Sequence, residues 1–173
     1  MRLLALIATV VFALDQATKW LVVYWLDLAN RGEIDVLSPL LNFRMAWNRG
    51  VNFGLLSGEA DLTRWVLIAI AVVISACVVW WVYRDQAGRW AMISAGMLVG
   101  GALGNVTDRL IWGAVADFLN MSCCGIENPF SFNVADVAIF AGAIGLVIFS
   151  DKPKTPAAPK TAGKAPRKPR KSA

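Results

Sequence analysis

Long apolar runs without charge constrain this sequence more than any other feature. A helix needs about 20 predominantly apolar residues to cross the hydrocarbon core of a bilayer, and runs of about 18 are already candidates. Four segments approach or reach this length, at residues 3–26, 65–83, 90–107 and 134–149. The sequence therefore predicts an α-helical integral membrane protein with four transmembrane helices, and it excludes a soluble enzyme.

The composition supports this class and removes several catalytic chemistries. Apolar residues make up 57% of the chain and charged residues only 17%, whereas about a quarter of the residues in soluble domains are charged. Histidine is absent, which excludes Ser-His-Asp and Cys-His catalysis and any histidine-ligated metal site. The three cysteines lack a Cys-x-x-Cys spacing, so no metal cluster is predicted.

The first apolar segment has some features of a secretory signal peptide, because Arg2 precedes it. However, Asp15 and Lys19 lie inside the segment, and no small-residue cleavage site follows it. We therefore interpret residues 3–26 as a retained transmembrane helix. The spacing of four residues between Asp15 and Lys19 favours an ion pair on one helix face.

Basic residues are concentrated on one side of the predicted helices. Residues 151–173 contain eight Lys and Arg residues and one acid, and the loop between the second and third segments adds Arg84 and Arg89. The positive-inside rule therefore places both termini in the cytoplasm. The tail is rich in proline and alanine, so we expect a disordered tail at 151–173 after a four-helix membrane domain at 1–150. No aromatic residue interleaves its charges, which favours contact with anionic membrane lipid and not with nucleic acid.

A glycine stripe in the third segment predicts close helix packing. Gly96, Gly100 and Gly104 recur at every fourth position. In membranes, such small residues let a second helix approach closely. We therefore expect these glycines to have a structural role.

The polar outer loop at 27–64 contains one further regular pattern. Residues 41–47 alternate apolar and polar side chains, which predicts a small β-strand element on the outer face. Phe43, Met45 and Trp47 share one face of this strand. We hypothesise that these three side chains clamp a bound substrate from above.

Ionisable and amide side chains gather near the outer ends of the third and fourth segments. They are Asp108, Arg109, Asp117 and Asp136, with Asn48, Asn105 and Asn133 nearby. Ionisable groups are costly in membranes and usually functional. Two carboxylates brought close share one proton, so one can activate a water molecule while the other polarises a carbonyl group. Ion pairing with Arg109 or Lys19 and helix capping are the structural alternatives for each acid. A Ser-Lys dyad is disfavoured, because Lys19 is the only lysine outside the tail and already has Asp15 as a partner.

Five motifs, in this order, resemble lipoprotein signal peptidase, the bacterial signal peptidase II family of membrane aspartic peptidases. They are Asp15-Gln16-Ala17-Thr18-Lys19, Asn48-Arg49-Gly50 with Phe53, the glycine-rich Gly100–Arg109 block, Val115-Ala116-Asp117-Phe118 and Phe132-Asn133-Val134-Ala135-Asp136. The resemblance covers residues 1–150. Asn52 departs from the small residue that relatives often have, and the tail lies outside the pattern.

The resemblance implies a role for each matched position. It implies a catalytic dyad of Asp117 and Asp136 near the outer membrane surface. The further substrate-binding or supporting positions are Asn48, Gly50, Asn105, Asp108, Arg109, Asn133, Ala135, Asp15 and Lys19. In this family Asn105 and Asn133 would orient the carboxylates or the scissile peptide, Asn48 and Arg109 would hold the substrate backbone, and Asp15, Lys19 and Asp108 would support the site.

The resemblance also implies the reaction and the surroundings of the enzyme. The substrate is a diacylglyceryl-modified prolipoprotein, which is cut just before its lipidated cysteine. No metal or organic cofactor is expected, and the cyclic depsipeptide globomycin is the expected inhibitor. The expected location is the bacterial inner membrane, with the active site at the outer, periplasmic face.

Two other classes of protein are weighed against a peptidase. A small transporter or channel would use the same polar cluster as an ion path, but the inner halves of the last three segments contain no acids. A non-catalytic assembly subunit would explain the glycine stripe but not the clustered aspartates and asparagines. The sequence ranks the peptidase first, the transporter second and the assembly subunit third.

Overall fold

Three long apolar helices and one shorter one form the body of the protein. The computed structural model describes residues 1–37, 40–50, 60–123 and 128–149. The first helix, α1 (Arg2–Lys19), continues into the π-helical segment η1 (Trp20–Trp25). The others are α3 (Ala60–Arg84), α4 (Arg89–Trp112) and α5 (Val134–Phe149).

The observed helices agree in part with the four predicted spans. The helix α1–η1, α3 and α4 are long and apolar enough to cross a membrane, whereas α5 is a shorter apolar helix of 16 residues. Helix α4 continues to Trp112, beyond the predicted end at residue 107. Asp108 lies inside α4 because its carboxylate is paired there and does not need water.

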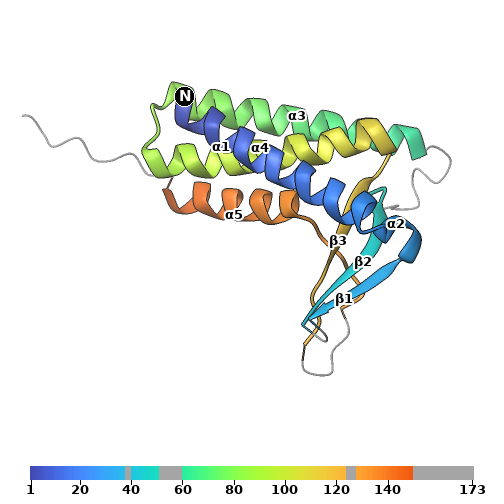
Figure 1. The fold of residues 1–173 in the computed structure, drawn as a ribbon. Coiled ribbons are helices and arrows are strands. Elements are labelled where there is room, and N and C mark those ends of the chain that lie inside the picture. Colours follow the sequence, from blue (N-terminus) through green and yellow to red (C-terminus); the bar gives the residue numbers. More distant parts are fainter. Residues whose placement is uncertain (38–39, 51–59, 124–127, 150–173) are drawn as a thin grey trace, which may run out of the picture.

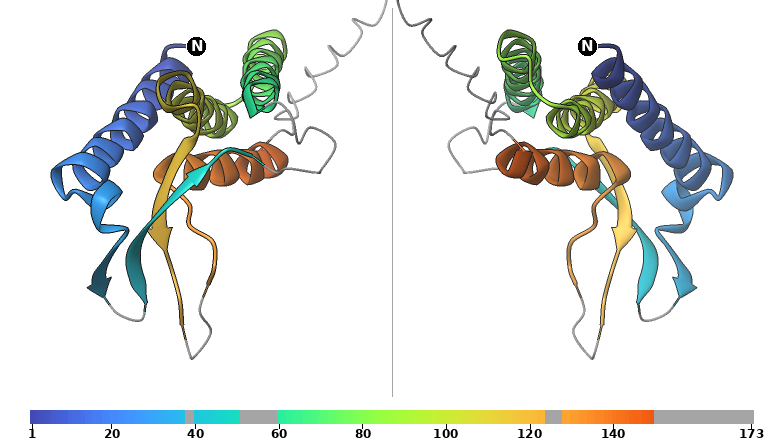
Figure 2. Two further views of the ribbon diagram at one scale, coloured as in Figure 1. Left: turned by 90° about the vertical axis from the view of Figure 1, so that its right-hand side faces the viewer. Right: turned by 90° about the vertical axis from the view of Figure 1, so that its left-hand side faces the viewer.

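Helix α4 is the centre of the bundle. It packs against α1, α3 and α5, and the end-on views place it between α1 and α3 with α5 alongside (Figure 2). The predicted glycine stripe lies at the contact with α1. A Cβ atom at Gly100 would collide with the backbone of Ala8, so glycine is required for this close approach.

A three-stranded antiparallel sheet extends from one end of the bundle (Figure 1). Its strands are β1 (Glu33–Leu37), β2 (Leu41–Asn48) and β3 (Val115–Asn120), in the order β1-β2-β3, and the short helix α2 (Leu28–Arg31) precedes them. The predicted strand at 41–47 lies within β2. Strand β3 was not predicted, and it pairs with β2 so that Asp117 lies opposite Ala46 and Val115 lies opposite Asn48.

The packing of β2 shows which neighbours the side chains of the predicted substrate clamp have in this structure. Phe43 and Met45 pack against a buried cluster of Val22, Leu28 and Phe118, and the Phe43 and Phe118 rings meet edge to face at 5.9 Å. Phe43 and Met45 thus help to hold the sheet to η1 and α2 while they remain half-buried, and the clamp stays a prediction. Trp47 packs edge to face on Trp112 instead.

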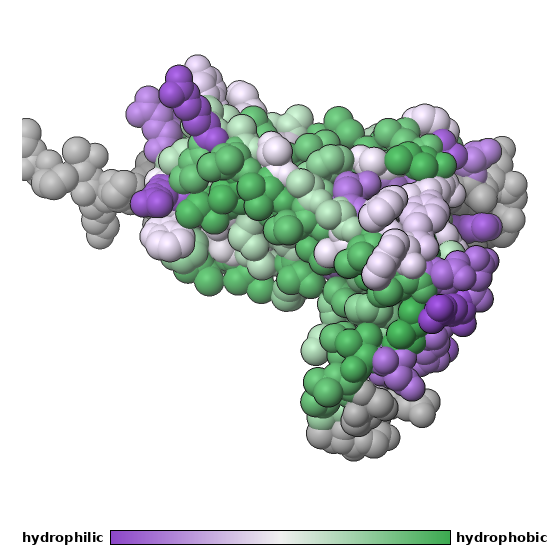
Figure 3. Space-filling view, in the orientation of Figure 1, coloured by the Kyte–Doolittle hydropathy of each residue, from purple (hydrophilic) through white to green (hydrophobic). Residues whose placement is uncertain are grey.

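On the face that Figure 3 shows, apolar residues cover most of the side of the bundle, and hydrophilic residues gather at its two ends and along one edge of the sheet. The first residue of α1 and the last residue of α5 lie at the same end of the bundle (Figure 1). This distribution is typical of a protein whose helices face lipid. The predicted tail at 151–173 lies outside the described residues.

Candidate active site

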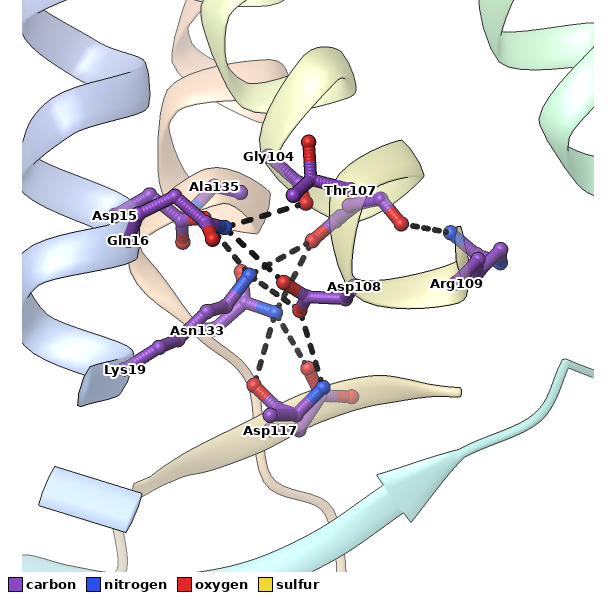
Figure 4. A network of polar contacts seen from close by, with 12 residues as sticks. Asp15, Gln16, Lys19, Gly104, Thr107, Asp108, Arg109, Asp117, Asn133 and Ala135 are labelled. Atoms are coloured by element: carbon purple, nitrogen blue, oxygen red, sulfur yellow. Dashed lines mark hydrogen bonds and ion pairs between the residues drawn. The ribbon is translucent and has the colours of Figure 1, made fainter. Parts of the chain in front are cut away.

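A buried ion cluster, formed by Asp15, Lys19 and Asp108, connects α1 to α4 near the end of the bundle that carries the sheet (Figure 4). The Lys19 Nζ atom lies 2.8 Å from Asp15 Oδ2 and 2.6 Å from Asp108 Oδ2, and all three side chains are fully buried. The predicted i, i+4 pair of Asp15 and Lys19 is thus present. Asp108 completes it and also accepts a hydrogen bond from the backbone N–H of Ala116 in β3.

Gln16 belongs to the same cluster, although sequence reasoning gave it no role. Its Nε2 donates to Asp15 Oδ2 and Asp108 Oδ1, each at 3.1 Å, and to the carbonyl oxygen of Gly104 at 3.4 Å. An amide next to Asp15 in a membrane helix was the available signal, because such a polar group requires partners.

Glycine and backbone groups bring α1, α4 and α5 together around Asp15. The other carboxylate oxygen of Asp15 accepts a hydrogen bond of 3.0 Å from the backbone N–H of Ala135, at the start of α5. A Cβ atom at Gly104 would collide with the Asp15 carboxylate. Asp15 therefore fixes the beginning of α5, and with it the position of Asp136.

Asp117 is held by two amide side chains. Asn133 Nδ2 donates to its Oδ1 at 2.6 Å, and Asn48 Nδ2 donates to its Oδ2 at 3.0 Å. The residue is only 3% exposed. Burial, followed by the charge of Asp136, raises the pKa of Asp117 to about 7, although the two amides and the Lys19 charge act in the opposite direction.

Asp136 lies in the first turn of α5, where it forms a reciprocal cap with Asn133. The backbone N–H of Asp136 donates to Asn133 Oδ1 at 2.9 Å, and the backbone N–H of Asn133 donates to Asp136 Oδ2 at 3.3 Å. Asn105 Nδ2 donates to Asp136 Oδ1 at 2.9 Å. The N–H donors and the positive end of the helix dipole stabilise a negative charge on Asp136.

Two asparagines join the two aspartates to each other and to the ion cluster. Asn133 contacts both carboxylates, as described above. The Oδ1 atom of Asn105 accepts hydrogen bonds from Lys19 Nζ and Asn133 Nδ2, both at 3.3 Å, which orients its amide group so that it donates to Asp136. The sequence-predicted residues of α1, α4, β3 and α5 thus form one connected network.

Gly50 and Arg109 border this network. Gly50 has a positive φ of 94°, and its N–H donates to Asn48 Oδ1 at 2.9 Å, so this tight turn orients the Asn48 amide toward Asp117. Arg109 donates to the carbonyl oxygen of Asn105 at 3.2 Å and is close enough to interact electrostatically with both Asp117 and Asp136.

An apolar cavity of about 250 Å³ adjoins the site between α3, α4 and α5. Its lining includes Leu67, Ile70 and Ile74 of α3, and Asn105 and Arg109 are its polar members. Among the described residues, no group of three His, Cys, Asp or Glu side chains is arranged to hold a metal ion. The arrangement offers two carboxylates joined through Asn133 beside an apolar space, and one of them, Asp117, has a pKa raised to about 7 by burial and by the charge of Asp136.

The buried Asp117 and the half-buried Asp136 are joined through Asn133 at one end of a bundle whose helices are apolar enough to cross a membrane, an arrangement that fits a membrane-embedded enzyme. Comparison with known proteins identifies the family. Residues 7–151 match the family model for signal peptidase (SPase) II, and the chain belongs to this family.

Curated relatives and solved structures agree with this assignment. The chain is 41% identical to the lipoprotein signal peptidase of Methylorubrum extorquens (strain PA1), over 92% of this chain and 90% of that one. It is 40% identical to that of Sphingopyxis alaskensis, over 81% and 80% of the two chains. Two bacterial membrane enzymes solved by the in meso method share its fold, with TM-scores of 0.70 and 0.66 at 28% and 30% identity, over 83% of this chain and 88% and 84% of theirs.

Proposed function

We propose that this membrane-embedded signal peptidase cleaves diacylglyceryl-modified prolipoproteins just before the lipidated cysteine, using Asp117 and Asp136 as a catalytic aspartate pair. The observation that carries the proposal is the hydrogen-bonded connection of the two aspartates through Asn133. Burial and the charge of Asp136 raise the pKa of Asp117 to about 7, so Asp117 can hold a proton near neutral pH. A two-carboxylate hydrolysis requires one protonated carboxyl group beside an ionised one, and we assign the proton to Asp117.

From these two environments we infer different roles for the two aspartates. Asp136, ionised at the start of α5, takes a proton from a water molecule as that water attacks the scissile carbonyl carbon. Asp117, protonated, donates its proton to the carbonyl oxygen as negative charge develops there. When the tetrahedral intermediate collapses, the C–N bond breaks and Asp136 returns the proton to the leaving amine. In the same step Asp117 regains a proton from a hydroxyl group of the intermediate. The fragment that now ends in a new carboxyl group then leaves the site.

Side chains around the pair position the substrate. Arg109 and Asn48, which flank Asp117, hold the substrate backbone, and the adjoining cavity takes an apolar part of the substrate. Asn105 and Asn133 keep the carboxylates oriented, while Gly50, Ala135 and the ion cluster support this geometry. Globomycin would compete for the same site, and no cofactor takes part.

The proposed position of the active site relative to the membrane follows from the depth at which the substrate lies in the bilayer. The signal peptide of a prolipoprotein lies in the bilayer, and its diacylglyceryl group favours hydrocarbon. The scissile bond therefore lies near the outer surface of the bacterial inner membrane, with both termini of the enzyme in the cytoplasm. Residues 1–150 then form the peptidase domain, and the basic tail at 151–173 contacts anionic lipid on the cytoplasmic side.

The test compares a diacylglyceryl-modified precursor with the same precursor lacking the lipid, using purified protein in detergent or lipid. Product mass should show cleavage of the lipidated precursor alone, directly before the modified cysteine. Asp117→Asn should abolish this cleavage while the protein stays folded. Folded wild-type protein that cleaves neither precursor would refute the proposal, and ion flux in liposomes would then test the transporter alternative.

A further inference from the structure

Helix α3 contains polar side chains that lack hydrogen-bond partners, and two of them, Thr63 and Arg64, lie near its outer end. In the part of the chain that the structure describes, the buried side-chain atoms without a partner are Thr63 Oγ1, Arg64 Nε and Ser75 Oγ, all on α3. Thr63 is only 8% exposed. A buried donor without a partner is costly, and each such group in a native protein requires an explanation.

Thr63 lies on the face of α3 that lines the apolar cavity beside the active site. Leu67, Ile70 and Ile74 of α3 line that cavity, and residues four and seven positions apart share a helix face. Thr63 precedes Leu67 by four residues, so it lies one turn closer to the outer end of the same stripe. The hydroxyl group of Thr63 thus lies one helical turn beyond the apolar residues of α3 that line the cavity.

Contacts on both sides tie this end of α3 to the active site. A Cβ atom at Gly50 would lie 3.4 Å from Thr63 and would collide with Leu67 at 2.6 Å, so the turn that orients Asn48 rests directly on α3. On the other side, the Arg64 Nη1 atom lies 3.7 Å from the Cβ position of Gly113, directly after α4. Thr63 therefore lies beside the turn that orients Asn48, and Arg64 lies beside the end of α4, one turn of α3 away from the cavity that Arg109 also lines.

Arg64 has no strong competing partner in the described part of the chain. Its Nη1 atom lies 3.9 Å from Asp61 Oδ1, and the Asp61 side chain is 89% exposed, so this pair is weak. The guanidinium group lies over the Trp65 ring, 5.1 Å from its centroid. Tryptophan at the end of a membrane helix marks the interface between hydrocarbon and water. The free Nε–H group is therefore held at interfacial depth.

We propose that Thr63 and Arg64 recognise the ester carbonyl groups of the substrate's diacylglyceryl moiety, with one acyl chain entering the cavity along α3. This inference rests on the proposed function. Ester carbonyls are acceptors without donors, so they match two unpartnered donors. In a glycerolipid they lie at the boundary between acyl chains and water, the depth at which Trp65 places Arg64. The acyl chain attached to an ester carbonyl matches the apolar side chains of α3 that line the cavity.

The test uses two lipidated precursors that differ only in the carbonyl groups. One carries the ester-linked diacylglyceryl group and the other carries an ether-linked dialkylglyceryl group of the same chain length. Wild-type enzyme should cleave both, with a lower KM for the ester. Thr63→Val and Arg64→Met should each raise the KM for the ester about threefold to tenfold, leave kcat unchanged and leave the KM for the ether unchanged.

Conservative and control variants separate recognition from folding. Thr63→Ser keeps the hydroxyl group and should keep the ester preference. Thr107→Val removes a hydroxyl group that is bonded to the Leu103 carbonyl oxygen within α4, and it should change neither KM. If wild type prefers neither substrate, or if Thr63→Val and Arg64→Met alter both KM values equally, the ester assignment is wrong. Failure of wild type to cleave either precursor would instead overturn the proposed function itself.

Discussion

Two groups of carboxylates lie close together in this protein, and they differ in what compensates their charge. In the ion cluster, Lys19 contacts the carboxylates of both Asp15 and Asp108 at ion-pair distance. Asp117 and Asp136 have no lysine at that distance in the described chain, and amide and backbone N–H groups hold them instead. We infer that the compensated group supports the fold, whereas burial and the charge of Asp136 raise the pKa of Asp117 to about 7, so that Asp117 can exchange a proton near neutral pH.

The comparison is tested most strongly by removing one charge from the proposed catalytic pair. Asp136→Asn keeps the shape of the side chain but removes the base, so cleavage should fall at least about 10³-fold. The thermal unfolding temperature in detergent should stay close to that of wild type, because no ion pair is lost. Asp35→Asn, an exposed acid of β1, is the matched control and should retain full activity. An active Asp136→Asn enzyme would remove Asp136 from the proposed pair.

The opposite outcome is expected when the ion cluster loses its cation. Lys19→Met leaves two buried carboxylates without a counter-charge, which should cost about 3–5 kcal/mol of folding stability. Thermal unfolding in detergent should show a large decrease, whereas Arg31→Met, on the exposed surface of α2, should show none. A variant as stable as wild type but inactive would mean that Lys19 acts in the reaction itself.

The packing that connects the ion cluster to the start of α5, and so to Asp136, can be tested at Gly104. A Cβ atom there collides with the Asp15 carboxylate, so Gly104→Ala should displace Asp15 from Ala135 and disturb the start of α5. Overpacking of this kind costs about 1–3 kcal/mol, and activity should fall together with stability. Gly88→Ala is the control, because no atom lies within 4 Å of its Cβ position. Equal behaviour of the two variants would contradict the tight packing around Asp15.

Sequence reasoning predicted the helices because long apolar runs have few alternatives, and it predicted the Asp15–Lys19 pair from spacing alone. It missed β3, because Val115 to Phe118 is buried throughout and shows no alternation of exposed and buried residues. That strand exists only through its pairing with β2, a contact between residues far apart in the chain. The neighbours of β2 were missed for a related reason: alternation places Phe43 and Met45 on one face but does not show that Val22 of η1 and Leu28 of α2 pack against these side chains.

The site was predictable to a similar degree. The motifs identified the aspartates and asparagines, but neither spacing nor composition distinguishes the environments of Asp117 and Asp136. That distinction comes from Asn133, which caps α5 and at the same time donates to β3. The bridging role of Gln16 and the unpartnered donors of α3 likewise depend on which helix faces meet.

The smallest expected effect concerns the proton on Asp117. The hydrogen bond from Asn48 lowers the pKa of this carboxyl group, so Asn48→Ala should raise that pKa further above its ordinary range. Asp117 then keeps its proton to higher pH, and the alkaline limb of kcat/KM, expected near pH 7 in wild type, should move upward by up to about one unit. The position of the limb is the readout, because weaker substrate binding lowers kcat/KM at every pH without moving it. Asn30→Ala, which removes an exposed amide bonded to Asp27, should leave the limb in place. A limb that stays fixed or moves downward in Asn48→Ala would show that Asp117 is not the group that must remain protonated.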